Sequence, residues 1–115
     1  MPIKERQSWM RKLCHEVVMA EDWLRTCVHF EMGKPWAQTH EDWDRGVASL
    51  DFYSEEIERF HDGGLADRSG THSHRMGYER AGGVVAVLAW QCPLLNLAVE
   101  LGPEVAAGCT LSSRT

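Results

Sequence analysis

The sequence lacks the surplus of positive charge by which nucleic-acid-binding proteins are usually recognised. Its 115 residues include 12 Lys and Arg against 17 Asp and Glu, a formal net charge of -5. It has no apolar run behind its basic start, so we expect no signal peptide. Its four cysteines form no close pair, and 43% hydrophobic side chains can build a core without disulfides. We therefore expect one domain over residues 1–115, with reduced thiols and a cytoplasmic location.

Apolar residues at alternating spacings of three and four predict a helix over residues 7–31. Gly33 and Pro35 should end it, because glycine caps helix C-termini and proline cannot continue a helix. A second helix is predicted over residues 40–62, where acidic residues in the first turn precede an apolar face. Two amphipathic helices joined by a short loop pack as an antiparallel hairpin.

Residues 81–99 carry no charged side chain, which predicts a third helix over residues 81–101 that is buried and kinked by Pro93. A membrane span is the alternative for this segment. A short C-terminal helix should open at Pro103, and the tail from residue 110 should fray. Residues 63–80 have no sustained period and are expected to form a polar loop. The predicted fold class is all-α, a small helical bundle.

The leading functional hypothesis is a small acidic, non-catalytic module that docks on a larger protein with a basic surface. Exposed tryptophans and an acidic helix flank would form its partner-binding surface. These residues are Trp9, Trp23, Trp36, Asp44, Asp51, Glu55 and Glu58. In size, charge and helical make-up the chain resembles anti-CRISPR inhibitors of phage and mobile elements, which implies that it blocks a nucleic-acid-handling protein. We also consider a homodimer, and expect no direct nucleic-acid partner, no membrane and no cofactor.

A metal-dependent hydrolase is the alternative hypothesis. His61 and Asp62, at the end of the second helix, resemble the His-Asp doublet of metal-dependent phosphohydrolases of the HD type. His72 and His74 form an HxH pair that can present both imidazoles if the segment is extended. Taken together, these four residues would hold a divalent metal that activates water for attack on a phosphorylated or nucleotide substrate. The simpler interpretation is a polar loop beside a histidine that interacts with the helix dipole.

Other catalytic signatures are weak or absent. Glu55, Glu56 and Glu58 resemble the magnesium-binding acids of all-α nucleotide pyrophosphatases, but a second inward acidic set is missing, and a solvated acidic face is the better explanation. The sequence contains no Gly-x-Ser-x-Gly elbow and no phosphate-binding loop. These absences favour a binding protein over an enzyme.

Overall fold

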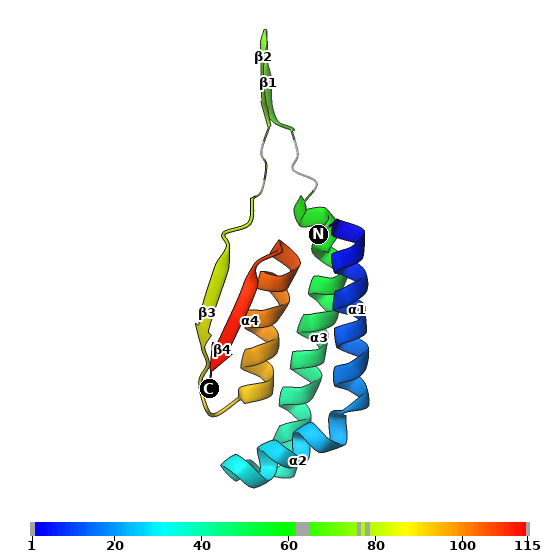
Figure 1. Ribbon diagram of the computed structural model, residues 1–115, viewed down its shortest axis with the longest axis vertical. Coiled ribbons are helices and arrows are strands. Elements are labelled where there is room, and N and C mark those ends of the chain that lie inside the picture. Colours follow the sequence, from blue (N-terminus) through cyan, green and yellow to red (C-terminus); the bar gives the residue numbers. More distant parts are fainter. Residues whose placement is uncertain (1, 62–64, 76, 78, 115) are drawn as a thin grey trace.

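The computed structural model describes residues 2–61, 65–75, 77 and 79–114. In these described ranges the chain forms three helices, then three strands, then a fourth helix and a fourth strand (Figure 1). Their bounds are α1 (Ile3–Met19), α2 (Glu21–Met32), α3 (Trp36–His61), β1 (Leu65–Ser69), β2 (His72–Arg75), β3 (Gly83–Val87), α4 (Pro93–Ala107) and β4 (Thr110–Arg114).

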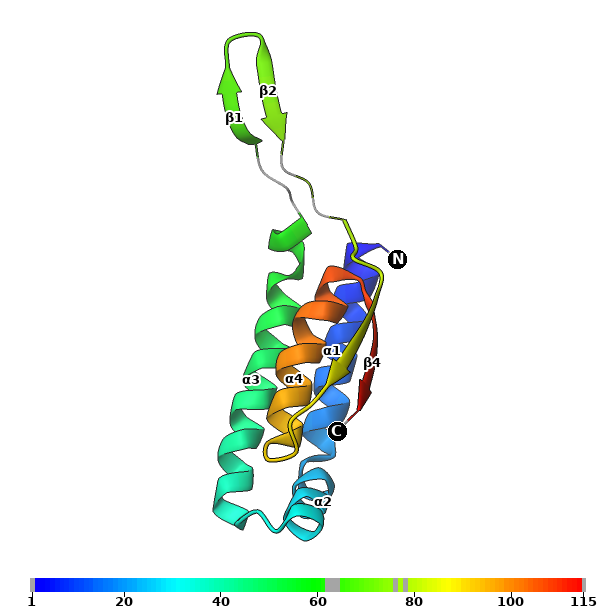
Figure 2. The same ribbon diagram turned by 90° about the vertical axis from the view of Figure 1, so that its left-hand side faces the viewer.

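Helices α1, α3 and α4 pack side by side along the long axis of the molecule (Figures 1 and 2). Small residues let α3 and α4 approach closely, because a Cβ placed on Gly46 would lie only 3.5 Å from the Cβ of Ala98. Met10, Ile57 and Ala106 bring the three helices together in a fully apolar cluster. This cluster is the part of the fold that hydrophobic burial stabilises most directly.

Strands β3 and β4 are parallel neighbours, and α4 connects them. Their register runs from Gly83 beside Thr110 to Val87 beside Arg114. Helix α4 lies against one face of the pair (Figure 1). The alternation of a strand then leaves Val85 and Val87 on the other face, where they are 78% and 84% exposed.

Strands β1 and β2 form an antiparallel hairpin that projects from one end of the helices (Figures 1 and 2). Gly70, in the turn, has a φ of 58°, a left-handed conformation that glycine adopts without steric cost. The projecting hairpin helps to make the molecule elongated, with extents of 63 × 24 × 23 Å.

The predicted all-α class is wrong, because β3 and β4 form a parallel strand-helix-strand unit. Residues 81–101 are not one kinked helix: β3 comes first, and Pro93 then starts α4 at its first turn. A short apolar run cannot be assigned to helix or strand from periodicity alone, and here its β-branched valines favour the strand. No helix in the described part of the chain is long and apolar enough to cross a bilayer.

Three further segments differ from the sequence expectation. The first predicted helix is two helices, since the chain breaks at Ala20 between α1 and α2. No separate helix opens at Pro103, which lies inside α4. The expected polar loop contains the β1–β2 hairpin, and the expected frayed tail is β4, held by its pairing with β3. By contrast, the helix predicted over residues 40–62 is present as α3 (Trp36–His61).

Candidate functional site

The carboxyl ends of β3 and β4 lie together at one edge of the parallel pair. Val87 and Arg114 are register partners there, and the backbone N–H of Leu88 donates to the Arg114 carbonyl at 2.8 Å. In open α/β sheets, ligands bind outside this edge, because the connecting loops and helix N-termini gather there. The residues that border it are residues 88–92, the start of α4 and the exposed Arg114.

The backbone of residues 88–92 is held in place while its central side chains are exposed. The Asn96 side-chain amide donates to the Ala89 carbonyl at 3.1 Å, and the Asn96 backbone N–H donates to the Cys92 carbonyl at 2.9 Å. Between these bonds, Trp90 and Gln91 are exposed. The loop therefore presents an aromatic ring and an amide at the edge where a ligand would bind.

Lys34 reaches this loop from the turn between α2 and α3. Its ammonium pairs with the Asp42 carboxylate and donates to the Gln91 carbonyl at 3.0 Å. It also donates to the Cys92 sulfur at 3.4 Å. The side chains of Lys34 and Asp42 are only 9% and 15% exposed. A lysine ammonium has three donors, and these three contacts use them.

The turn that carries Lys34 is fixed by its own local bonds. Gly33 ends α2 in a left-handed conformation with a φ of 73°, and its N–H donates to the His29 carbonyl at 3.0 Å. A ring nitrogen of His29 lies 2.6 Å from the Lys34 carbonyl oxygen. The sequence Gly33-Lys34-Pro35 thus ends α2, directs the Lys34 side chain towards residues 91 and 92, and precedes the start of α3.

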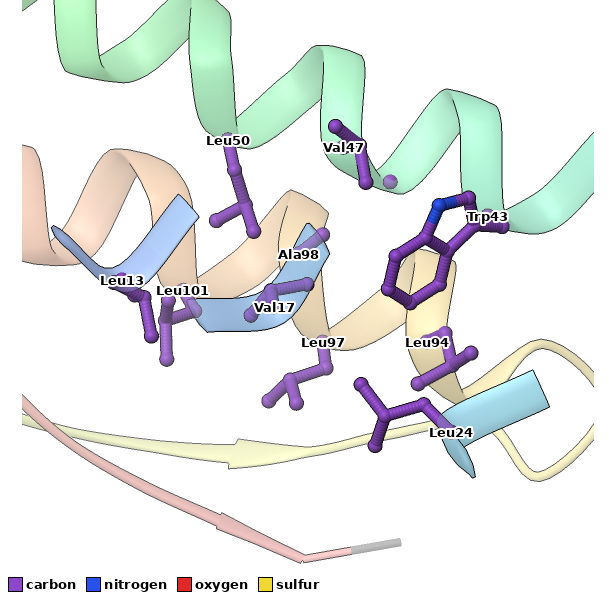
Figure 3. Close-up of a pocket in the computed structure, with 11 residues that line it drawn as sticks. Leu13, Val17, Leu24, Trp43, Val47, Leu50, Leu94, Leu97, Ala98 and Leu101 are labelled. Atoms are coloured by element: carbon purple, nitrogen blue, oxygen red, sulfur yellow. The ribbon is translucent and has the colours of Figure 1, made fainter. Parts of the chain in front are cut away.

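Two cavities lie near this end of the fold. The larger, about 200 Å³, lies between the four helices, and apolar side chains from all four point into it (Figure 3). Apart from the indole N–H of Trp43, its lining is apolar and cannot orient a polar substrate, so we assign no chemistry to it. The smaller, about 140 Å³, lies between α2 and the loop and is bounded by Cys27, Glu31, Trp90 and Pro93 among others.

The three tryptophans singled out in the sequence are all exposed, to 55% for Trp9, 69% for Trp23 and 44% for Trp36. Lys12 lies over the Trp9 ring at 4.8 Å, and the Arg25 guanidinium lies over the Trp36 ring at 4.2 Å. These residues are spread over α1, α2 and the start of α3. A partner surface formed by them remains a prediction.

The predicted acidic flank lies along α3 and is partly paired within the chain. The Asp44 carboxylate lies 3.2 Å from Nε2 of His40, and Glu55 forms an ion pair with Arg11 of α1, also at 3.2 Å. Asp51 and Glu58 are exposed. All four are in water, where such pairs contribute little free energy. Their role towards a basic partner also remains a prediction.

The predicted metal ligands are only partly covered by the structure. His72 is exposed on β2, and one of its ring nitrogens lies 3.0 Å from the Thr71 hydroxyl. Asp62 and the side chains of His61 and His74 lie outside the described residues. Among the residues that are described, no group of three or more His, Cys, Asp or Glu side chains is placed to hold a metal.

The sequence analysis missed Lys34, Gln91 and Arg114. A local signal did exist for Gln91. A short run rich in β-branched residues precedes it and a proline that can start a helix follows it, and this pattern marks the end of a buried strand. Lys34 has no such signal, because its partners on the loop are 57 and 58 residues away.

A family model described as the aldehyde dehydrogenase family matches residues 1–114. Human mitochondrial succinate-semialdehyde dehydrogenase is 28% identical over 109 residues, which cover 94% of this chain and 20% of that protein. The 3-sulfolactaldehyde dehydrogenase of Pseudomonas putida is 23% identical over 111 residues, covering 96% of this chain and 23% of that protein. The chain therefore spans about a fifth of the length of the curated relatives it matches.

Solved structures give the same fold. The glyceraldehyde-3-phosphate dehydrogenase GapN of Methanocaldococcus jannaschii, complexed with NADP, superposes with a TM-score of 0.90 at 18% identity, over 98% of this chain and 24% of that chain. An aldehyde dehydrogenase from Brucella melitensis superposes with a TM-score of 0.90 at 23% identity, over 99% of this chain and 24% of that chain. Such identities establish the fold alone.

These matches overturn the functional hypotheses drawn from the sequence. The predictions of a non-catalytic, anti-CRISPR-like inhibitor from phage or mobile elements and of a metal-dependent hydrolase using His61, Asp62, His72 and His74 were both wrong, because the aldehyde dehydrogenase model matches almost the whole chain. Charge and helical content misled the analysis, since neither records the parallel strand-helix-strand unit that the family shares with this chain.

Proposed function

Because this chain belongs to the aldehyde dehydrogenase family, we propose that it contributes part of a dinucleotide-binding sheet to an enzyme that oxidises an aldehyde. The observation that carries this proposal is the β3–α4–β4 unit, whose strands end side by side at Val87 and Arg114. Ligands of open α/β sheets bind at such an edge. The loop of residues 88–92, with Trp90 and Gln91 exposed, is then the part of the chain that faces cofactor or substrate.

We propose a short aldehyde with an acidic group as the substrate. Two of the curated relatives are named for succinate semialdehyde and 3-sulfolactaldehyde, and a structural relative is named for glyceraldehyde-3-phosphate. These aldehydes share a carboxylate, sulfonate or phosphate near the carbonyl carbon. A cation in the complete site would select this class by charge.

We propose a nicotinamide dinucleotide as the cofactor, since two of the solved relatives are described with NADP or as NADP-dependent. The described residues fit it in part: Arg114 places a cation at the carboxyl end of β4, suited to the cofactor's phosphates. The turn after β3 has no glycine and lacks the Gly-rich phosphate-binding sequence, so the pyrophosphate must be held by other residues. When bound, the cofactor supplies the hydride acceptor for the oxidation.

We propose that a second copy of the chain covers the β1–β2 hairpin. An isolated two-stranded hairpin is marginally stable in water, and its edges have unpaired backbone groups that invite further pairing. This hairpin projects beyond the helices instead of packing on them (Figure 2). Deleting residues 66–74 should therefore lower the subunit number measured by native mass spectrometry.

The cytoplasmic location expected from the sequence also remains a proposal. It is supported by the four cysteines, all of which are free thiols in the structure. Free thiols persist in reducing compartments. Fractionation of cells that express the tagged protein tests this location directly.

The decisive experiment measures cofactor binding and aldehyde oxidation by the purified full chain. Titration with NADP+ and NAD+ by calorimetry should show one site for each subunit, and succinate semialdehyde should be oxidised faster than betaine aldehyde. Arg114→Gln should weaken cofactor binding about tenfold, the loss expected for one charged hydrogen bond. Arg59→Gln, at an exposed arginine of α3, is the matched control and should bind as the unmodified protein does. Failure to bind either cofactor would contradict the proposal.

A further inference from the structure

We propose that Lys34, held by Asp42, is a positioning residue that fixes residues 90–92 at the ligand edge of the sheet. The inference rests on the proposed function for the meaning of that edge, but its geometry is independent of it. Lys34 lies on the turn between α2 and α3, and the loop lies between β3 and α4. Its ammonium therefore joins two parts of the chain that no backbone hydrogen bond joins in the described structure.

Lys34 contacts the peptide group on the carboxyl side of Gln91, whose side chain is exposed. The ammonium binds the Gln91 carbonyl at 3.0 Å, and that carbonyl belongs to the peptide linking Gln91 to Cys92. The same ammonium binds the Cys92 sulfur at 3.4 Å, and Cys92 is the residue that precedes the first turn of α4. Rotation of this peptide would move the Gln91 side chain, so the ammonium sets where that amide lies.

Asp42 keeps the ammonium aimed at the loop. A lysine head group turns freely on a four-carbon stem, and the carboxylate removes that freedom by taking one of its three donors. Both side chains are largely withdrawn from water, which strengthens the hydrogen bond to the carbonyl. The rest of the loop is held by Asn96, through the Ala89 and Cys92 carbonyls on either side of Gln91, and by the Leu88 N–H, which donates to the Arg114 carbonyl.

A positioning role for the Lys34–Asp42 pair can be distinguished from a role in stability alone. A buried ion pair often contributes little net stability and can be replaced by apolar residues without loss. The double variant Lys34→Met with Asp42→Leu removes both charges together and so leaves neither uncompensated. It should keep the melting temperature of the unmodified protein while losing the donor to Gln91.

Three measurements on the full chain test the proposal. Hydrogen exchange of the amides in residues 88–92 should accelerate about tenfold in the double variant, because a backbone anchor is gone. In the aldehyde oxidation assay kcat should fall about ten- to a hundredfold, the usual effect of a misplaced group in an active site. Lys12→Met, at an exposed lysine of α1, is the matched control and should change neither. Circular dichroism melting accompanies each variant.

The outcomes separate the two proposals. Wild-type exchange or wild-type kcat in a stably folded double variant would overturn the positioning role. If the double variant does not fold, Lys34→Arg replaces it, since it keeps a cation beside Asp42 but with a planar donor geometry; unchanged kcat and exchange there overturn the role equally. If the unmodified protein binds no dinucleotide and oxidises no aldehyde, the proposed function fails, and the exchange measurement still decides whether Lys34 anchors the loop.

Discussion

Replacing Gly108 with alanine tests how tightly the end of α4 is packed against the N-terminal helix. Gly108 ends α4 with a φ of 86°, and a Cβ placed there would lie 2.9 Å from the guanidinium carbon of Arg6 and 2.9 Å from Cδ of Arg80. Arg6 is 8% exposed and donates to the Ala106 carbonyl at 2.8 Å. The added methyl group must therefore displace a buried, hydrogen-bonded cation.

Two costs add in this variant. A left-handed backbone costs an alanine about 1–2 kcal/mol. Disturbing the charged hydrogen bond of Arg6 costs about 1.5–3 kcal/mol more. Gly33→Ala is the matched control, because Gly33 also ends a helix at positive φ but has no atom within 4 Å of its added Cβ, so only the first cost applies.

Urea denaturation of both variants measures the difference between them. Gly108→Ala should lose about 3 kcal/mol of unfolding free energy or more, and Gly33→Ala about 1–2 kcal/mol. Repeating Gly108→Ala in an Arg6→Leu background should remove most of the excess, because the guanidinium is then absent and only Cδ of the exposed Arg80 must still move. Equal losses for Gly108→Ala and Gly33→Ala would refute the contact with Arg6 as the cause.

Three further predictions concern the helices. Arg25→Met should lower the free energy of unfolding in urea by about 3 kcal/mol, because the buried guanidinium bonds Thr39, Glu21 and the Trp36 carbonyl at once. Arg25→Lys should be destabilised as well, since a lysine ammonium cannot reproduce the planar donor geometry. Losses under about 0.5 kcal/mol would contradict this. Burial, and secondarily the charge of Asp51, raise the pKa of the Cys14 thiol above its ordinary value, so the thiolate is disfavoured. Asp51→Asn should therefore speed alkylation by iodoacetamide near neutral pH, followed by mass spectrometry, and an unchanged rate would exclude the carboxylate as a cause. Val17→Leu should raise the free energy of unfolding in urea by about 0.8 kcal/mol, because its added methylene fills the interhelical cavity. Val18→Leu, at an exposed side chain, is the control and should not raise it. Equal effects of the two substitutions would show that the cavity is not filled.

The sequence was sufficient for the helices whose signals are local. The apolar face and acidic first turn of residues 40–62 predicted α3, and Gly33 was correctly expected to end the preceding helix. The break at Ala20 was missed because the alternating apolar spacing continues through it from α1 into α2. Apolar spacing indicates which side chains share a helix face. It cannot reveal one non-helical residue between two helices when the spacing continues unchanged across that residue.

The strands were missed because their partners are distant in sequence. Residues 110–114, Thr-Leu-Ser-Ser-Arg, are short and mostly polar, and only pairing with β3 makes them a strand. Parallel pairing always requires a long connection, here all of α4, so no local pattern announces it. The same distance hid the site, since Lys34 meets Gln91 and Cys92 only after β3 and α4 are in place.

The continuous apolar run of β3 explains why this segment was predicted to be part of a buried helix. Residues 84–88 are continuously apolar, a pattern typical of parallel strands that are covered on both faces. Helix α4 covers one face, towards which Ala86 is buried, and Val85 and Val87 face away from it. Their side chains are thus suited to a larger sheet with a second layer, as expected for a chain that spans about a quarter of its structural relatives. The apolar run that suggested a buried helix is therefore better explained by a strand: its composition is that of an interior strand of a parallel sheet, with Ala86 buried towards α4 and Val85 and Val87 available to a second covering layer.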